Sequence, residues 1–171
     1  MEEIIQEIKE YFEKKQGYIN LFINYNTRIE GWFLGELINF LYSKNIKINS
    51  VGKPIKEIKK EGKTRKPDLI LKIDDKIIIL ELKAISIQDG GWRNLETYFE
   101  KRKMNGLVKD FEKLSESNKY KEYLIIFAYS NTPIKINEWE ERVKRTEKKY
   151  NIKEISKKQM NGNFLISLWT K

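Results

Sequence analysis

The chain contains no cysteine and no histidine in 171 residues. Without cysteine there is no disulfide scaffold, no cysteine-ligated zinc site and no cysteine nucleophile. Without histidine there is no histidine general base, and hence no Ser-His-Asp triad. Any chemistry must therefore rely on carboxylates, lysine, hydroxyl groups and a bound metal ion.

Long apolar runs are also missing. No stretch approaches the roughly 20 apolar residues that a membrane-spanning helix needs. The first seven residues are acidic and helix-like, whereas a signal peptide begins with basic residues and continues with an apolar centre. We therefore expect a soluble, cytoplasmic protein with no membrane partner. Its length predicts a single domain spanning residues 1–171.

Positive charge is in excess, because 34 Lys and Arg residues stand against 25 Asp and Glu residues, giving a net charge of +9. This balance favours a polyanionic partner such as nucleic acid. The alternative is a composition rich in Lys, Glu and Ile, as in thermophilic proteins, with no such partner. The segment 52–66 is the most basic and is predicted to be a connection that meets phosphates by charge, with Lys63, Arg65 and Lys66 as candidate nucleic-acid contacts. A solvated charge run is the other interpretation.

Two apolar, β-branched runs, residues 69–73 and 77–82, flank Asp74-Asp75. This pattern predicts a β-hairpin with a two-residue loop. In that register Ile73 faces Lys76, and each further step outward pairs the next two residues. The alternative is a surface hairpin that carries ordinary solvated charges.

The same register places Asp68 directly opposite Glu81. Cross-strand Cβ atoms lie roughly 4.5 to 5.5 Å apart, and Lys83 follows Glu81 on the same face of the strand. Two carboxylates about 5 Å apart repel by roughly 3 kcal/mol at an effective dielectric near 20. A divalent cation such as Mg²⁺, which prefers oxygen ligands, removes this repulsion. A lysine beside it can stabilise the charge of a phosphate.

Pro67-Asp68, twelve intervening residues and then Glu81-Leu82-Lys83 resembles the signature of the PD-(D/E)xK nuclease superfamily. That superfamily includes restriction enzymes, Holliday-junction resolvases and repair exonucleases. The resemblance covers roughly residues 25 to 130 and implies a restriction-endonuclease-like fold. It also implies a Mg²⁺ site, open to Mn²⁺, with Asp68, Glu81 and the Leu82 backbone carbonyl as ligands and Lys83 as the catalytic lysine.

In several such nucleases an acid from the N-terminal helix joins the metal site, and Glu30 is the residue that the resemblance assigns to this role. A helix is predicted from about Thr27 to Ser43, with Glu30 on its apolar stripe, where an unpaired carboxylate is disfavoured. The alternatives for Glu30 are a capping box with Thr27 and simple exposure. Glu36 is a second candidate, with solvated helix charge as its alternative. Gln88 is a candidate accessory residue that orients water or touches substrate, or else a plain loop residue.

The remaining apolar spacings predict the other elements. Helices are expected at 3–14, within 92–115 with a break near 105–106, and at 137–150; strands at 45–51, 123–129, 152–155 and 164–169; and irregular segments at 17–26 and 85–91. The nearly unbroken apolar run at 123–129 is typical of a central strand, and its helical connection to the hairpin implies a parallel neighbour. The expected fold class is a single α/β domain with a mixed central sheet and flanking helices.

The function predicted from these patterns is a Mg²⁺-dependent nuclease, with DNA favoured over RNA as its substrate. A homodimer is expected if both strands of a duplex are cut, because one small domain covers little duplex. One alternative is a catalytically inactive nuclease-fold module that binds nucleic acid or a protein. Another is a basic binding domain of different topology. Gly62-Lys63-Thr64 resembles the end of a P-loop, but Glu57 stands where the earlier glycine is required, so that interpretation is rejected.

Overall fold

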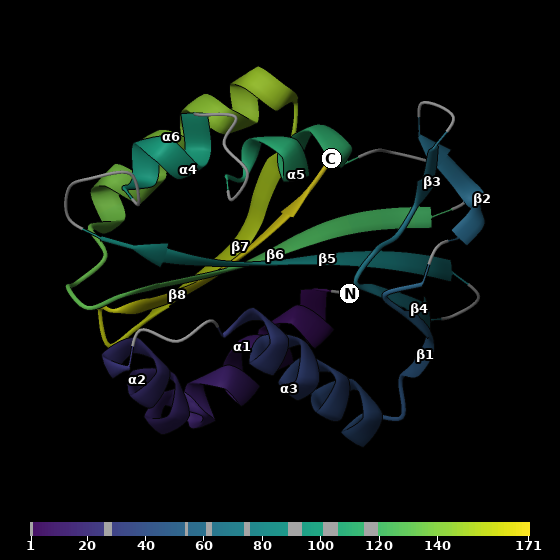
Figure 1. Ribbon diagram of the computed structural model, residues 1–171, viewed down its shortest axis with the longest axis horizontal. Coiled ribbons are helices and arrows are strands. Elements are labelled where there is room, and N and C mark those ends of the chain that lie inside the picture. The colour runs from purple at the N-terminus through teal and green to yellow at the C-terminus, as the bar shows by residue number, and fades with distance from the viewer. Residues whose placement is uncertain are drawn as a thin grey trace.

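The computed structural model describes residues 2–25, 29–53, 55–60, 63–73, 76–88, 94–100, 106–114 and 120–171. The helices are α1 (Glu2–Lys14), α2 (Gln16–Asn24), α3 (Glu30–Ser43), α4 (Leu95–Glu100), α5 (Val108–Lys113) and α6 (Ile136–Tyr150). The strands are β1 (Lys47–Val51), β2 (Ile55–Lys60), β3 (Lys63–Arg65), β4 (Leu69–Ile73), β5 (Lys76–Ile87), β6 (Tyr120–Ser130), β7 (Lys153–Met160) and β8 (Phe164–Thr170). Figure 1 shows a central sheet with α1, α2 and α3 on one face and α4, α5 and α6 on the other.

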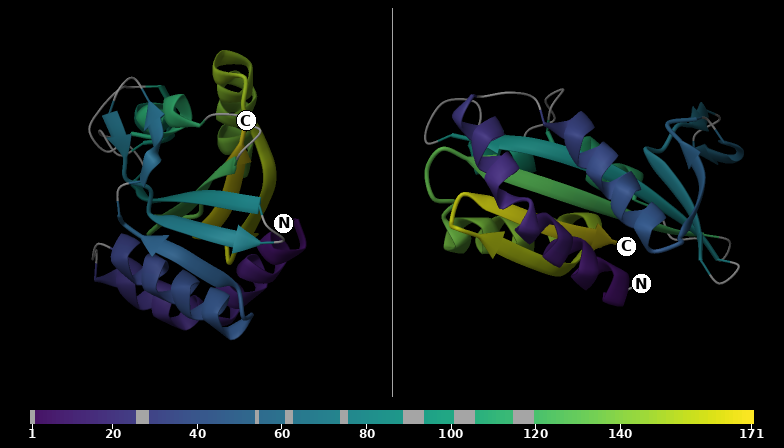
Figure 2. Two further views of the ribbon diagram at one scale, coloured as in Figure 1. Left: turned by 90° about the vertical axis from the view of Figure 1, so that its right-hand side faces the viewer. Right: turned by 90° about the horizontal axis from the view of Figure 1, so that it is seen from below.

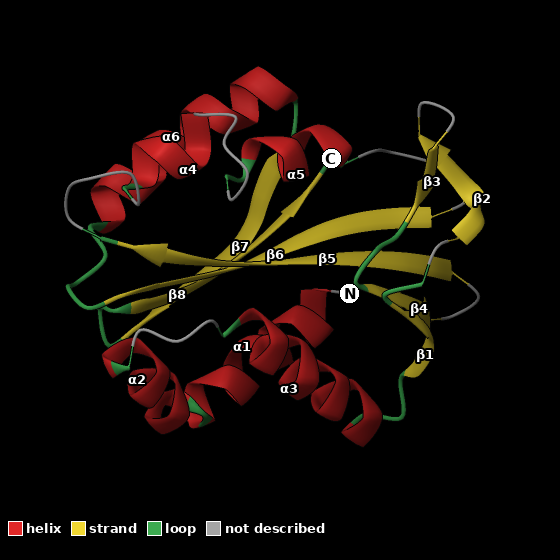
Figure 3. Cartoon of the chain, viewed as in Figure 1, coloured by secondary structure: helices red, strands yellow, loops and turns green. Residues whose placement is uncertain are grey.

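The central sheet has six strands in the order β1-β4-β5-β6-β8-β7. Its only parallel pair among the described strands is β5 with β6, and the other neighbours are antiparallel. Strand β6 lies in the middle and is buried from Tyr123 to Ser130. The predicted central strand with a parallel neighbour is confirmed, as is the mixed α/β class with helices on both faces (Figure 3).

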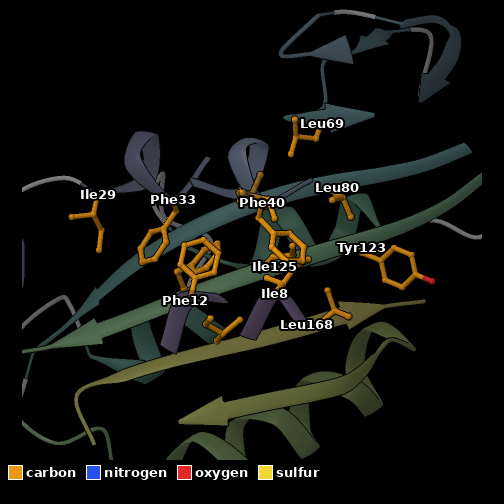
Figure 4. Close-up of a cluster of buried hydrophobic side chains, with 14 of the residues drawn as sticks. Ile8, Phe12, Ile29, Phe33, Phe40, Leu69, Leu80, Tyr123, Ile125 and Leu168 are labelled. Carbon is orange, nitrogen blue, oxygen red and sulfur yellow. The ribbon is translucent and has the colours of Figure 1, made fainter. Parts of the chain in front are cut away.

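Each face of the sheet has its own apolar core. On the face of α1 and α3, the ring of Phe33 stacks on that of Phe127 with centroids 3.9 Å apart, and Phe12 packs edge-on against Phe127 at 5.0 Å. Figure 4 shows the rings of Phe12 and Phe33 next to each other in this cluster, where their centroids are 5.4 Å apart. On the other face, Trp139 of α6 joins a second cluster with residues of α4 and α5. The sheet is therefore covered on both sides, and its edges are the exposed part.

In the described residues no helix has both the length and the apolar character that a membrane crossing demands.

The predicted hairpin register is confirmed, since Ile73 pairs with Lys76 and Lys72 with Ile77. The loop residues 74–75 lie outside the described residues. The expected irregular segment 85–91 is wrong for its first three residues, because β5 continues to Ile87, which pairs with Ser130 of β6. Pairing with a strand far along the sequence thus extends β5 beyond its own hairpin.

Two further expectations on the N-terminal half are corrected. The expectation that segment 17–26 is irregular is wrong, because most of it forms α2, in which Ile19 and Ile23, one turn apart, are both buried against the core. The helix expected from Thr27 begins at Glu30, with Ile29 as its N-cap residue and no side-chain cap. Thr27 lies outside the described residues, so the capping box is not tested.

Candidate active site on the edge of the central sheet

Strand β5 is longer than its neighbour β4. The antiparallel ladder between them ends at Leu69 and Leu80, whereas the pairing of β5 with β6 continues to Ile87. Among the described strands, none pairs with residues 81–87 on the β4 side. We call this stretch the open edge of β5. Its outward backbone N–H and C=O groups need partners other than a strand.

Two carboxylates supply acceptors at this edge. Asp68 Oδ2 accepts a hydrogen bond from the Leu82 amide at 2.8 Å, and Glu30 Oε2 accepts one from the Ala84 amide at 3.1 Å. The two donor nitrogens are two residues apart, which is about 7 Å along a strand. Glu30, at the start of α3, and Asp68, at the end of the β4 ladder, therefore bond to the two residues of β5 that flank Lys83.

Asp68 is held from both sides. Its backbone carbonyl accepts a hydrogen bond from the Gly52 amide at 2.9 Å, immediately after β1, while its side chain bonds to Leu82 of β5. Gly52 has a φ of +55°, a conformation that favours glycine. Leu69, the next residue, is fully buried and begins β4. The backbone of Asp68 is therefore held at the end of β1 and its carboxylate at β5, and the residue is half-buried.

Glu81 and Lys83 lie on the opposite face of β5 from the α1 and α3 helices. They alternate with Leu80 and Leu82, which belong to the core beneath those helices. Both side chains are half-buried. The ladder ends at the pair of Leu69 and Leu80, so Asp68 and Glu81 are the next residues outward on the two strands. Their position opposite each other, which the hairpin register implies, stays a prediction. In the described part of the chain, no hydrogen bond or ion pair engages the Lys83 ammonium group.

These residues fit a hard divalent cation. The donors at this point are oxygens: the carboxylates of Asp68 and Glu81, and the Leu82 carbonyl, which points to the same side of the strand as the Leu82 amide. Oxygen donors suit Mg²⁺ and Mn²⁺. Within the residues that the structure describes, however, no three acidic side chains gather closely enough to hold an ion together.

Glu30 therefore lies near Asp68 and Glu81 but does not form a three-acid cluster with them. Of the alternatives for Glu30, burial on the apolar stripe of its helix is wrong and simple exposure is confirmed, because Glu30 is exposed. The physical reason is its place as the first residue of α3, where the side chain can leave the helix and reach the edge of β5. Glu36 has a different role, since it binds the Tyr11 hydroxyl at 2.5 Å and the Lys15 ammonium at 3.2 Å and so links α1 to α3.

Gln88 is not brought to the site. It follows β5 directly and is exposed, five residues beyond Lys83, or about 17 Å along the strand. There it lines a separate cavity of about 140 Å³ between the ends of β5 and β6 and the starts of α4 and α6. The accessory role predicted for Gln88 would therefore have to be exerted away from Asp68 and Glu81.

Of the three basic residues predicted to contact nucleic acid, the structure describes the side chain of one. Lys66 is exposed and lies two residues before Asp68. Lys63 and Arg65 belong to β3, and their side chains lie outside the described part of the structure. Sequence reasoning missed the contact of Gly52 with Asp68. A glycine directly after a predicted strand was the available signal, because it marks a place where the chain can take a left-handed conformation.

Comparison of the chain with protein-family models, with curated proteins and with solved structures finds no match in any of the three. The functional argument therefore depends on the geometry of the open edge.

Proposed function

We propose that the chain is a divalent-metal-dependent nuclease of the PD-(D/E)xK type, with a restriction-endonuclease-like fold, that hydrolyses phosphodiester bonds in DNA. The observation that carries the proposal is the Asp68–Leu82 hydrogen bond at the point where the β4–β5 ladder ends. It holds the Asp68 carboxylate at Leu82, the residue that lies between Glu81 and Lys83 in the chain. The hairpin register predicts that Asp68 faces Glu81, with Lys83 one step along the same face. The order of elements agrees with the resemblance: a helix that carries an acid, an antiparallel hairpin, then helices and a parallel strand.

Each residue has a defined task in this proposal. Asp68 and Glu81 would hold the cation, with the Leu82 carbonyl as a third oxygen donor. A divalent cation bound there would make a water molecule more acidic and would place a positive charge beside the scissile phosphate. The Lys83 ammonium stabilises the negative charge that builds up on the phosphate oxygens. Glu30 positions the strand next to Lys83 through the Ala84 amide.

The first experiment is a cleavage assay with plasmid, single-stranded DNA, a four-way junction and RNA, each with Mg²⁺ or Mn²⁺. The variants are Asp68→Asn, which keeps an oxygen for the Leu82 amide but removes the charge, and Lys83→Gln. Lys76→Gln is the matched control, because Lys76 is an exposed lysine at the start of the same strand. We expect metal-dependent cutting that is abolished in the first two variants and kept in the control.

The assignment would be overturned if none of the four substrates is cut, or if both active-site variants cut as well as the wild type. In that case the catalytically inactive, nuclease-fold binding module becomes the better description. The homodimer expected for double-strand cleavage stays a prediction, which sedimentation of the protein with and without substrate would check.

A further inference from the structure

Strands β2 and β3 form an arm that is separate from the central sheet. They pair with each other in an antiparallel, two-stranded sheet of their own. Figure 1 and the right panel of Figure 2 show this arm projecting from one end of the molecule. The expectation that residues 52–66 form a plain connection is therefore wrong, because antiparallel pairing turns much of this basic segment into a ribbon.

The arm lies within the most positively charged segment of the chain. The segment from Lys53 to Lys66, which contains both strands, has seven basic and two acidic residues, a net charge of +5 out of +9 for the whole protein. Apart from a proline, its apolar residues are Ile55 and Ile58. A two-stranded ribbon with so little apolar surface is marginally stable by itself. Its composition therefore suits a charged partner better than a packing role.

The arm is rooted at the candidate active site. The chain leaves β1 at Val51, and Gly52 bonds to the Asp68 carbonyl at 2.9 Å, so the two ends of the arm meet at Asp68. The arm also rises on the side of the sheet that α4, α5 and α6 cover (Figure 1). Glu81 and Lys83 lie on that same face of β5. A polyanion held by the arm would therefore be held beside the two acids.

The shape of the arm selects the form of the polyanion. The major groove of B-form DNA is about 12 Å wide and admits a two-stranded β-ribbon. The major groove of an RNA duplex is too narrow and deep for side chains to read, and a single strand has no groove. We propose that the β2–β3 arm inserts into the major groove of duplex DNA and delivers the duplex to Asp68 and Glu81. This inference rests on the proposed function for its choice of nucleic acid.

The test is equilibrium binding without divalent metal, in an Asp68→Asn background that cannot cut. The arm variant replaces Lys56, Lys59 and Lys60 with Gln. A matched control of equal charge replaces three exposed lysines of α6 and β7, namely Lys144, Lys148 and Lys153. Duplex DNA, one of its strands alone and duplex RNA of the same sequence are each titrated at several salt concentrations.

We expect the affinity of the arm variant for duplex DNA to fall at least about tenfold, and the slope of log K against log salt to shrink by about 0.9 for each phosphate that the arm no longer neutralises. The control should stay within about threefold of the parent, and single-stranded DNA and duplex RNA should respond to the arm variant no more than to the control. Equal reductions in the arm variant and the control, or unchanged duplex affinity in the arm variant, would overturn the inference. An equal reduction on duplex RNA would overturn the assignment to the DNA groove.

Failure of this inference and failure of the proposed function give different results. Binding is measured without metal, so it does not depend on hydrolysis. If the arm variant binds duplex DNA weakly while Asp68→Asn and Lys83→Gln cut as well as the wild type, the arm assignment holds and the nuclease assignment fails. If cutting depends on Asp68 and Lys83 but the arm variant binds normally, the arm assignment fails alone.

Discussion

The carboxylates at the open edge of β5 and those at the corner formed by β7, β8 and α6 are bonded in different ways. At the corner, Glu154 Oε1 accepts hydrogen bonds from Trp139 Nε1, at 2.9 Å, and from the Ser167 hydroxyl. Both donor residues are fully buried. The backbone amide of Glu154 in turn donates to Glu147 at 2.9 Å. One oxygen of the Glu154 carboxylate is therefore held by two buried side-chain donors.

The open edge is arranged differently. Asp68 is half-buried and Glu30 is exposed, and each binds one backbone amide of β5. A carboxylate has two oxygens and about four acceptor sites, so each retains capacity for a further ligand. Since Asp68 and Glu154 are both half-buried, the difference between the two regions lies in the bonding partners: a backbone amide at the edge of a strand, or the donors of two buried side chains.

The largest effect that would sharpen this comparison is catalytic. Glu81→Gln should slow cleavage by about a thousandfold, which is about 4 kcal/mol in the activation free energy. It removes one of the two charges that would hold the cation. Glu154→Gln should leave the rate within about threefold, since the corner takes no part in the reaction. Single-turnover cleavage with Mg²⁺ measures both rates, and equal reductions in the two variants would contradict the division of roles.

The next effect concerns stability and runs the other way. Glu154→Ala should lower the free energy of unfolding by about 2 to 4 kcal/mol, because two buried donors, on Trp139 and Ser167, are left without their acceptor. Asp68→Asn should change it by less than about 1 kcal/mol, since an amide oxygen can still accept from Leu82. Urea unfolding measures both values. A larger decrease for Asp68→Asn than for Glu154→Ala would reverse the comparison.

A smaller effect would test the edge itself. Glu30→Ala should cost about 0.5 to 1.5 kcal/mol and should speed hydrogen exchange at the Ala84 amide, whose acceptor it removes. Glu30→Gln is the matched control, because its side-chain oxygen can still accept. Amide exchange followed by NMR resolves the single site. Unchanged protection of Ala84 in the alanine variant would show that this hydrogen bond does not close the edge in solution.

The smallest effect is on the pH dependence of stability. Burial raises the pKa of the Glu154 carboxyl, although its hydrogen bonds from Ser167 and Trp139 oppose the rise. The folded state therefore binds its proton more tightly than the unfolded state does. The stability from this group is fully present below its unfolded pKa, about 4.3, and is lost as the pH rises through the folded value. Unfolding of wild type and Glu154→Gln from about pH 4 to 7 should show the wild type losing stability relative to the variant as the pH rises. A relative gain would contradict the direction.

Much of the hairpin could be predicted from the sequence, because its causes are local. Two β-branched runs around Asp74-Asp75 predict one short loop, and that register gives every pair of the ladder as far as Leu69 with Leu80. The helical spacing of residues 3–14 is sufficient to predict α1 for the same reason. The resemblance and the helix pattern select Glu30, and exposure is one of the alternatives given for it, but its hydrogen bond to Ala84 could not be predicted. That bond depends on how α3 lies across the sheet.

Residue identity and contacts a few residues apart are sufficient to predict the acids, the lysine, the β4–β5 hairpin and the excess of positive charge. The tertiary structure is needed to show that β5 extends beyond β4, that Glu30 reaches the open edge and that much of the basic segment pairs as an arm close to Asp68. These features arise from pairing and packing between segments far apart in the chain. The free energy of such contacts depends on which surfaces meet, and periodicity within one segment does not encode that choice.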